Sequence, residues 1–317
     1  MTLPAPACGA EAETLDRRLH IGHGALSAVV VPELGGGLAR LDFMSGGQSL
    51  PLLRPEPPGA AGDPFALGMQ ILVPWSNRIS SGGFSFGGRR HELQPNVEGE
   101  PFPIHGNGFS RPWEVLSVTA DAVTLCLESD GPGPFRYRAG LTYAIQGGSL
   151  RTALDLCNTG NDKLPFGLGF HPWFRRTLQT ELQARSRGVW QETTQHLPLG
   201  TEPVPLLAEW DFSRSASLPE GFINNAFVGW DGRATVYWPD TGLQLRIEAS
   251  PVLSTYILYS PGSQADFFCF EPVSHAVDAF NLPGPPEAHG LVVLAPGQSM
   301  AASVTLSVAM EAGGGGS

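Results

Sequence analysis

The stretch Leu150-Arg151-Thr152-Ala153-Leu154-Asp155-Leu156 decides the fold class, because its side chains alternate between two kinds. In an extended chain, the leucines and the threonine fall on one side, and the arginine, alanine and aspartate fall on the other. The same period of two recurs at residues 123–128, 243–248 and 303–310. A period of two with one apolar face is typical of half-buried antiparallel strands. The sequence therefore predicts sheets with one face on a core and the other in water.

Glycine and proline punctuate the chain between these runs. The 317 residues include 40 glycines and 29 prolines, a density that favours short strands and turns over long helices. Turn-rich segments lie at residues 81–83, 87–88, 130–134, 147–148 and 231–232. We therefore expect an all-β protein, built as a large antiparallel β-sandwich. Residues 191–220 are irregular and polar, which predicts a long surface excursion.

The composition does not change along the chain in a way that would mark a linker. This predicts one domain over residues 13–312, preceded by a loose N-terminus at residues 1–12. Residues 313–317 have the sequence Gly-Gly-Gly-Gly-Ser, which is typical of a flexible tail.

The formal net charge is −11, and no run of lysine or arginine exceeds two residues. Nucleic acids and anionic membrane surfaces attract the opposite charge, so neither is an expected partner. The first twenty residues lack the basic and apolar regions of a signal peptide, and no apolar run is long enough to span a membrane. We expect a soluble cytoplasmic protein, a monomer or homodimer, whose partner is a small molecule.

The four cysteines, Cys8, Cys126, Cys157 and Cys269, are scattered and form no CxxC pair. This spacing excludes the common redox and zinc-knuckle motifs. Cys126 and Cys157 fall within predicted strands, where a free cysteine usually serves as a small core residue.

The motif Gly169-Phe170-His171-Pro172-Trp173-Phe174 carries the strongest functional signal. Pro172 biases His171 toward an extended backbone. Trp173 and Phe174 add a rigid aromatic wall that suits stacking on the face of a sugar. The motif favours a histidine that transfers protons at a ligand site. The alternative is a core histidine hydrogen-bonded to the backbone.

Three further residues could join His171. Arg78 should emerge at a strand end, where its guanidinium could grip hydroxyls or pair with a surface acid. His105 lies in a loop rich in proline and glycine, either as a ligand contact or simply exposed. Glu271 closes the apolar run Phe267–Phe270, so it is buried at a site or faces water. Burial would raise its pKa, and a nearby cation would lower it.

A metal site is not expected. His275 and His289 could be combined with His105 and His171, but no two of the four have the short spacing of a local metal-binding motif. The glycine pairs at residues 82–83 and 87–88 lack the strand–turn–helix setting of a phosphate-binding loop.

In their order along the chain, these pieces resemble the aldose 1-epimerase (galactose mutarotase) family. The resemblance spans roughly residues 20–310. Its motifs are Asn77-Arg78-Ile79, Gly83-Phe84-Ser85-Phe86-Gly87, the Asn96 region, His105-Gly106 followed by Trp113, the motif at 169–174, Glu271-Pro272 and Asp278-Ala279-Phe280-Asn281. Each motif alone is weak, whereas together and in the correct order they are specific. The resemblance implies a large antiparallel β-supersandwich.

The resemblance also implies an activity, the exchange of α and β anomers of a free aldose without metal or organic cofactor. Glu271 would take the proton of the C1 hydroxyl, and His171 would protonate the ring oxygen. His105, Arg78 and Asn77 would bind the sugar. Anomer exchange needs one proton removed and one delivered, so we expect a carboxylate and a histidinium that stabilise each other's charged form.

Two positions depart from the family pattern. Asn224 stands where many members carry an aspartate that holds sugar hydroxyls, and an amide carries no charge. Trp173 stands where tyrosine or phenylalanine is common, which would change the shape of the pocket. We count both as substrate-binding residues, and the preferred sugar is therefore open.

Three alternatives remain at this stage. An epimerase-like protein could act on a phosphorylated or sulfonated sugar, for which Arg89-Arg90 and Arg175-Arg176 are the available cation pairs. A non-catalytic carbohydrate-binding protein would not need both His171 and Glu271. A glycosidase would need two facing carboxylates, and only Glu271 stands out.

Overall fold

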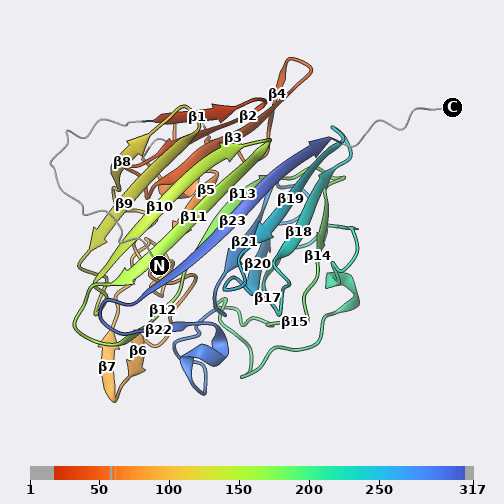
Figure 1. Ribbon diagram of the computed structural model, residues 1–317. Helices are drawn as coiled ribbons and strands as arrows, with labels where there is room; N and C mark the ends of the chain where they lie inside the picture. Colours follow the sequence, from red (N-terminus) through yellow and green to blue (C-terminus); the bar gives the residue numbers. More distant parts are fainter. Residues whose placement is uncertain (1–17, 58, 61, 311–317) are drawn as a thin grey trace.

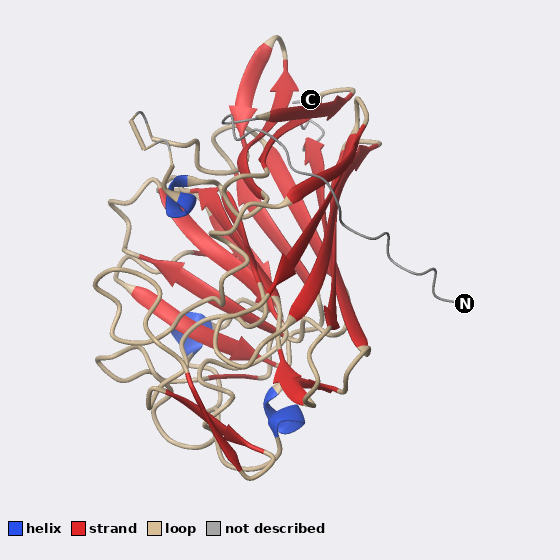
Figure 2. Cartoon of the chain, turned by 90° about the vertical axis from the view of Figure 1, so that its left-hand side faces the viewer, coloured by secondary structure: helices blue, strands red, loops and turns tan. Residues whose placement is uncertain are grey.

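Two antiparallel sheets lie face to face across a shared hydrophobic core in the computed structural model of the chain (Figure 1). The structure describes residues 18–57, 59, 60 and 62–310. The expected loose N-terminus, the first residues of the expected domain (13–17), its last residues (311–312), the tail at 313–317 and Cys8 lie outside the described residues. Within these residues the helical elements are short 3₁₀ turns, which Figure 2 shows in blue: η1 (Pro64–Ala66), η2 (Ala208–Trp210) and η3 (Pro286–His289).

The first sheet, within the described residues, has ten strands. In spatial order they are β1 (Leu19–His23), β2 (Leu26–Val31), β3 (Gly37–Ser45), β5 (Met69–Leu72), β13 (Gly169–Arg175), β21 (Phe267–Val273), β20 (Thr255–Ser260), β17 (Ile223–Val228) and β15 (Gly188–Val189), with β4 (Gln48–Pro51) paired to β3. Strands far apart in the sequence therefore become neighbours at the middle of this sheet.

The second sheet has nine strands in the same part of the chain. They are β16 (Ala216–Ser217), β14 (Glu181–Ala184), β18 (Arg233–Trp238), β19 (Leu243–Ala249), β23 (Ser299–Met310), β11 (Ser149–Asn158), β10 (Tyr137–Gln146), β9 (Ala122–Ser129) and β8 (Glu114–Val118). Two small antiparallel pairs complete the described strands: the hairpin of β6 (Gly83–Phe86) with β7 (Arg89–Glu92), and the pair of β12 (Leu164–Phe166) with the distant β22 (Val292–Leu294). The predicted all-β fold with large antiparallel sheets is confirmed.

The alternation that predicted the second sheet is confirmed in its burial. Along β11, Leu150, Leu154 and Leu156 are buried, whereas Arg151 and Asp155 are exposed. Leu154 pairs in register with Leu141 on β10 and Ala302 on β23, so its apolar face is continuous across three strands. The prediction was wrong for Met310, which is 45% exposed because it is the last residue of β23, at the end of the sheet.

The central strands of the first sheet are buried on both faces. All four residues of β5, five of six in β20 and six of seven in β21 are buried. On β21, Phe268 and Phe270 join the core between the sheets, and the alternate residues Cys269 and Glu271 point the other way, where loops cover them. This second buried face explains why the sequence of the strand is a run of apolar residues and not an alternation.

The excursion at residues 191–220 is confirmed as irregular, with η2 and the two-residue β16 inside it. It is not only a surface feature, because Phe212 is fully buried and His196 reaches a cavity over the first sheet. No helix of the described residues is both long enough and apolar enough to cross a lipid bilayer.

Candidate active site

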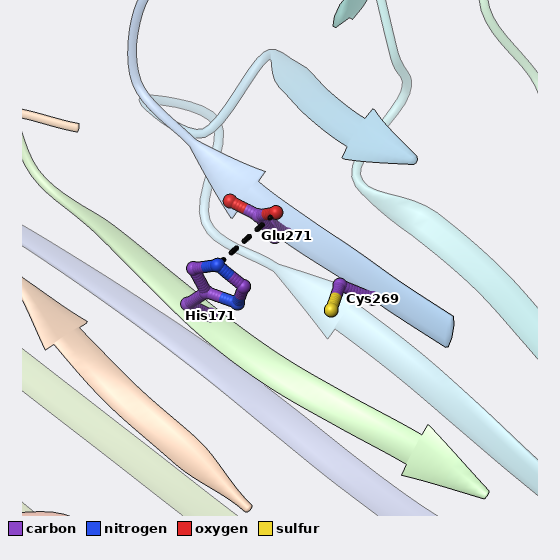
Figure 3. Close-up of side chains that lie close together, drawn as sticks. All are labelled: His171, Cys269 and Glu271. Carbon is purple, nitrogen blue, oxygen red and sulfur yellow. Dashed lines mark ion pairs between the residues drawn. The ribbon is translucent and has the colours of Figure 1, made fainter. Parts of the chain in front are cut away.

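Strand pairing brings His171 and Glu271 together. Strands β13 and β21 are antiparallel neighbours, with Gly169 opposite Val273 and Trp173 opposite Cys269. Midway between these pairs, His171 stands opposite Glu271, and its Nε2 atom lies 3.4 Å from the Oε1 atom of the carboxyl group (Figure 3). Their exposed fractions are only 7% and 3%. Neighbouring residues of paired strands come this close as a consequence of sheet geometry.

Burial dominates the electrostatics of this pair. It raises the pKa of Glu271 to about 8, against an opposing effect of the Arg78 charge. It lowers the pKa of His171 to about 3, against an opposing effect of the residue's own backbone and reinforced by the Arg54 charge. Between these values the pair holds a single proton, with both groups uncharged. The expectation that each group stabilises the other's charged form was wrong, because desolvation outweighs their mutual attraction.

The plane of the His171 ring is held by the residue two positions along the strand. The Trp173 indole stacks on the imidazole at 5.2 Å with an interplanar angle of 7°. Trp173 donates its Nε1–H to the Gln70 side-chain oxygen at 2.8 Å, and the Gln70 amide donates to the carbonyls of Pro64 and Leu67. The guanidinium of Arg54 lies 4.0 Å from the indole centroid. Trp173 therefore supports the imidazole as well as lining the cavity.

His105 is buried, not exposed, and its tautomer follows from its contacts. Its Nδ1 atom accepts the backbone N–H of Asn77 at 3.0 Å. A neutral imidazole with an accepting Nδ1 must carry its proton on Nε2. Burial, followed by the nearby His171 and Arg78, lowers the pKa of His105 well below its usual range, so the neutral form holds. His105 thus offers an Nε2–H donor on the cavity side.

Arg78 fulfils both interpretations of its position. It lines the cavity, and it also forms a two-point ion pair with Glu100, at 3.0 Å from Nε to Oε2 and 2.8 Å from Nη2 to Oε1. Asn77, at a φ of 58°, accepts the Arg78 backbone N–H with its side-chain oxygen. The ion pair leaves the other N–H groups of the guanidinium for a ligand.

Two residues of the family motifs, Asn96 and Asp278, support the loops of the site and do not line the cavity. Asn96 bonds to both sides of the His105 loop, through the carbonyls of Ile104 and Gly106 and the Ile104 N–H. The Asp278 carboxylate accepts both the N–H and the hydroxyl of Ser80, which fixes the chain just after Arg78.

Asn224 belongs to a small network that the sequence did not reveal. Its amide donates to Glu192 Oε2 at 3.1 Å, and the same oxygen lies 3.1 Å from His196 Nδ1. Asn224 and His196 line the cavity, and Glu192 lies behind them beside a smaller void. The carboxylate absent from position 224 is therefore present nearby, one layer back, on the 191–220 excursion.

All seven predicted site residues meet at one cavity of about 580 Å³. They are Asn77, Arg78, His105, His171, Trp173, Asn224 and Glu271. Its volume lies in the range of small-molecule sites, about 300–1,000 Å³. Aromatic side chains of Phe65, Phe222 and Tyr259 complete the walls.

The other two histidines considered as metal ligands, His275 and His289, lie outside this site. His275 is buried, with Nε2 accepting the Ser76 N–H and Nδ1 donating to the Ala276 carbonyl, so both nitrogens are occupied. His289 lines a separate cavity of about 680 Å³. Among the described residues, one group of possible metal ligands converges, and it consists of His171, Cys269 and Glu271. Cys269 was not a predicted site residue.

Comparison with known proteins identifies the family of the chain. The profile of the aldose 1-epimerase family matches residues 17–307. The chain is 36% identical over 265 residues to YphB of Escherichia coli (strain K12), an uncharacterized protein, covering 81% of this chain and 89% of YphB. A crystal structure of a candidate aldose 1-epimerase from E. coli K12 superposes with a TM-score of 0.85 at 33% identity, over 93% of this chain and 99% of that one.

A galactose mutarotase-like protein from Clostridium acetobutylicum has a TM-score of 0.81 over 92% of this chain and 95% of its own. At 17% identity, this likeness bears on the fold alone. The structural neighbours thus define a galactose mutarotase-like fold. The chain belongs to the aldose 1-epimerase family.

Proposed function

We propose that the protein is an aldose 1-epimerase that interconverts the α and β anomers of a free aldose. The observation that carries the proposal is the buried pair of His171 and Glu271, 3.4 Å apart on adjacent strands at the wall of a cavity of about 580 Å³. A base and an acid held this close can act on the two oxygens of one hemiacetal.

The reaction moves two protons. Glu271 takes the proton of the C1 hydroxyl, and His171 gives a proton to the ring oxygen as the bond from C1 to that oxygen breaks. The product is the open-chain aldehyde with a hydroxyl at the former ring oxygen. Rotation about the C1–C2 bond presents the other face of the carbonyl. Closure with reversed roles then yields the other anomer and restores the pair.

The single proton shared by the pair is the proton that the proposed reaction needs. At neutral pH the resting pair holds it on the carboxyl group, because burial raises the pKa of Glu271 and lowers that of His171. Its transfer across the 3.4 Å gap produces a carboxylate base and an imidazolium acid. Polar sugar hydroxyls in the cavity favour this charged form, since they replace part of the lost solvation.

Binding groups surround the reacting pair. The Nε2–H of His105 is a donor on the cavity side, and the free N–H groups of Arg78 are a second source. Asn77 and Asn224 offer amides, and Trp173 offers an aromatic edge. We assign these five residues to substrate binding.

An unmodified sugar fits the charges better than a phosphorylated or sulfonated one. The arginine doublets do not line the cavity. Arg89 pairs with Asp162 and Arg175 pairs with Asp240, and Arg176 is buried against Ser260. Arg78 is already paired with a carboxylate, so the cavity offers little free positive charge to an anionic group.

Polarimetry tests the proposal. Freshly dissolved α-D-glucose and α-D-galactose should reach their equilibrium rotation faster with the protein than without it. A panel of anomerically pure aldoses would then identify the preferred sugar. If no aldose in such a panel equilibrated faster than in buffer, the proposed activity would be rejected.

A further inference from the structure

The thiol of Cys269 lies beside the proposed acid–base pair and has no part in its reaction. Cys269 precedes Glu271 by two residues on β21, so both side chains project from the same face. The sulfur, one imidazole nitrogen of His171 and one carboxylate oxygen of Glu271 all lie within 4.8 Å of one another. Figure 3 shows the three side chains converging from two adjacent strands.

Two atoms of this group are buried without a hydrogen-bond partner: Nδ1 of His171 and Oε2 of Glu271. Buried polar atoms of this kind are uncommon, so the two side chains are not held by hydrogen bonds at these atoms, and their facing atoms Nε2 and Oε1 are the ones available to a shared ligand. The other described cysteines differ. Cys126 and Cys157 lie on β9 and β11 of the second sheet, and neither belongs to the group of converging metal ligands.

The spacing of the pair suits a metal ion. Two ligands at about 2.1 Å from a tetrahedral zinc ion lie about 3.4 Å apart. The distance from His171 Nε2 to Glu271 Oε1 is 3.4 Å. The sulfur, within 4.8 Å, needs a small shift inward to complete the set. Nitrogen, sulfur and oxygen together are a ligand set of borderline-soft cations such as Zn²⁺ and Cd²⁺.

We propose that His171, Cys269 and Glu271 form a binding site for a thiophilic divalent cation, Zn²⁺ or Cd²⁺, and that the bound cation excludes the sugar. Binding forms bonds to a thiolate, a carboxylate and a neutral imidazole. The thiol and carboxyl protons pass to solvent, and the two negative charges match the divalent ion. A fourth coordination position stays open toward the cavity for water.

The neighbouring cations do not prevent this. Arg78 faces the site but is neutralised by its two-point contact with Glu100. Arg54 is the other cation near the trio, and its guanidinium lies over the rings of Trp173 and Phe267. One opposing charge remains against two anionic ligands.

Cadmium titration tests the site directly, because a cadmium–thiolate bond gives an ultraviolet charge-transfer band. The wild-type protein should develop this band with one equivalent of Cd²⁺. Cys269→Ala should lose the band, and Cys157→Ala, the matched control, should keep it. Cys269→Ser gives a second variant should the alanine protein fold poorly. A band that is absent from the wild type, or unchanged in a folded Cys269 variant, would overturn the proposal.

The exclusion of sugar rests on the proposed function and is measured separately. Zn²⁺ should slow mutarotation, and both a chelator and excess sugar should restore the rate. Cys269→Ala should keep its basal activity and need at least about 10–100-fold more Zn²⁺ for the same inhibition, because losing a direct ligand costs no less than losing an outer partner of a ligand. Equal inhibition of wild type and Cys269→Ala would contradict the inference. If no aldose were turned over, the cadmium band would still decide the metal site.

Discussion

The two sheets of this protein use their outer faces differently. The second sheet packs one face on the core and exposes the other, as Leu154 and Asp155 do on β11. The central strands of the first sheet bury both faces, and the face away from the core carries His171 and Glu271. A buried polar face costs stability, because its groups lose water. The difference teaches that the first sheet holds the candidate site, whereas the second sheet contributes mainly to stability.

The largest expected effect comes from removing the base. Glu271→Gln keeps the shape of the side chain but cannot accept the C1 proton, so kcat/KM should fall by about 10²–10⁴-fold. His171→Asn should have a similar effect. Polarimetry measures both, and Glu248→Gln, on the exposed face of β19, is the control that should keep full activity. Full activity in Glu271→Gln would show that another group removes the proton.

A substitution on the second sheet should have the opposite effect, lowering stability and leaving activity unchanged. Leu154→Ala should lower the free energy of unfolding by about 2–5 kcal/mol, since it leaves a cavity in the core beside Leu141 of β10 and Ala302 of β23. The activity per folded molecule should not change. Urea unfolding measures the first quantity and polarimetry the second. Arg151→Ala, on the exposed face of the same strand, should stay within about 0.5 kcal/mol of wild type. A loss of turnover without a loss of stability in Leu154→Ala would break the division between the sheets.

The pH dependence of activity should report the single proton of the buried pair. Below the His171 pKa of about 3 the pair gains a second proton and has no base. Above the Glu271 pKa of about 8 it loses its last proton and has no acid. The catalysed rate, after subtraction of the buffer rate, should therefore fall about tenfold per pH unit above pH 8. A catalysed rate that continued to rise to pH 10 would contradict this assignment.

The last prediction concerns the stability cost of the site itself. The folded-state pKa of Glu271, about 8, is above its usual 4.5, so its contribution to stability is full below pH 4.5 and is lost as the pH rises to 8. Glu271→Gln has no such loss. Its melting temperature, measured by circular dichroism, should therefore rise relative to wild type between pH 5 and pH 8. A constant difference over that range would mean that the carboxyl group is not desolvated.

Much of the second sheet could be predicted from the sequence, because a half-exposed strand records its burial as alternation. The strand of Leu150–Leu156 is an example. The first sheet gives no such signal, and Phe267–Glu271 is a run of buried residues whose two faces serve different purposes. The motifs nevertheless singled out His171, Glu271 and five further residues that line the same cavity, because these residues are marked by unusual local neighbours.

The rest of the site depends on contacts between distant segments. Cys269 gave no signal of its own, and only the pairing of β13 with β21 places its thiol near His171. Glu192 and His196 lie in an excursion that the sequence marks only as irregular. The protonation of the pair also could not be predicted, because it depends on how deeply loops bury it.

The central claim is that His171 and Glu271 act on one hemiacetal from adjacent strands. A crystal structure of Glu271→Gln with α-D-glucose, or with whichever aldose the panel identifies, tests it most directly. We predict one pyranose in the cavity, with its ring oxygen about 2.6–3.2 Å from His171 Nε2 and its C1 hydroxyl at the same distance from the amide at position 271. A sugar bound there with its anomeric carbon far from both groups would contradict the account.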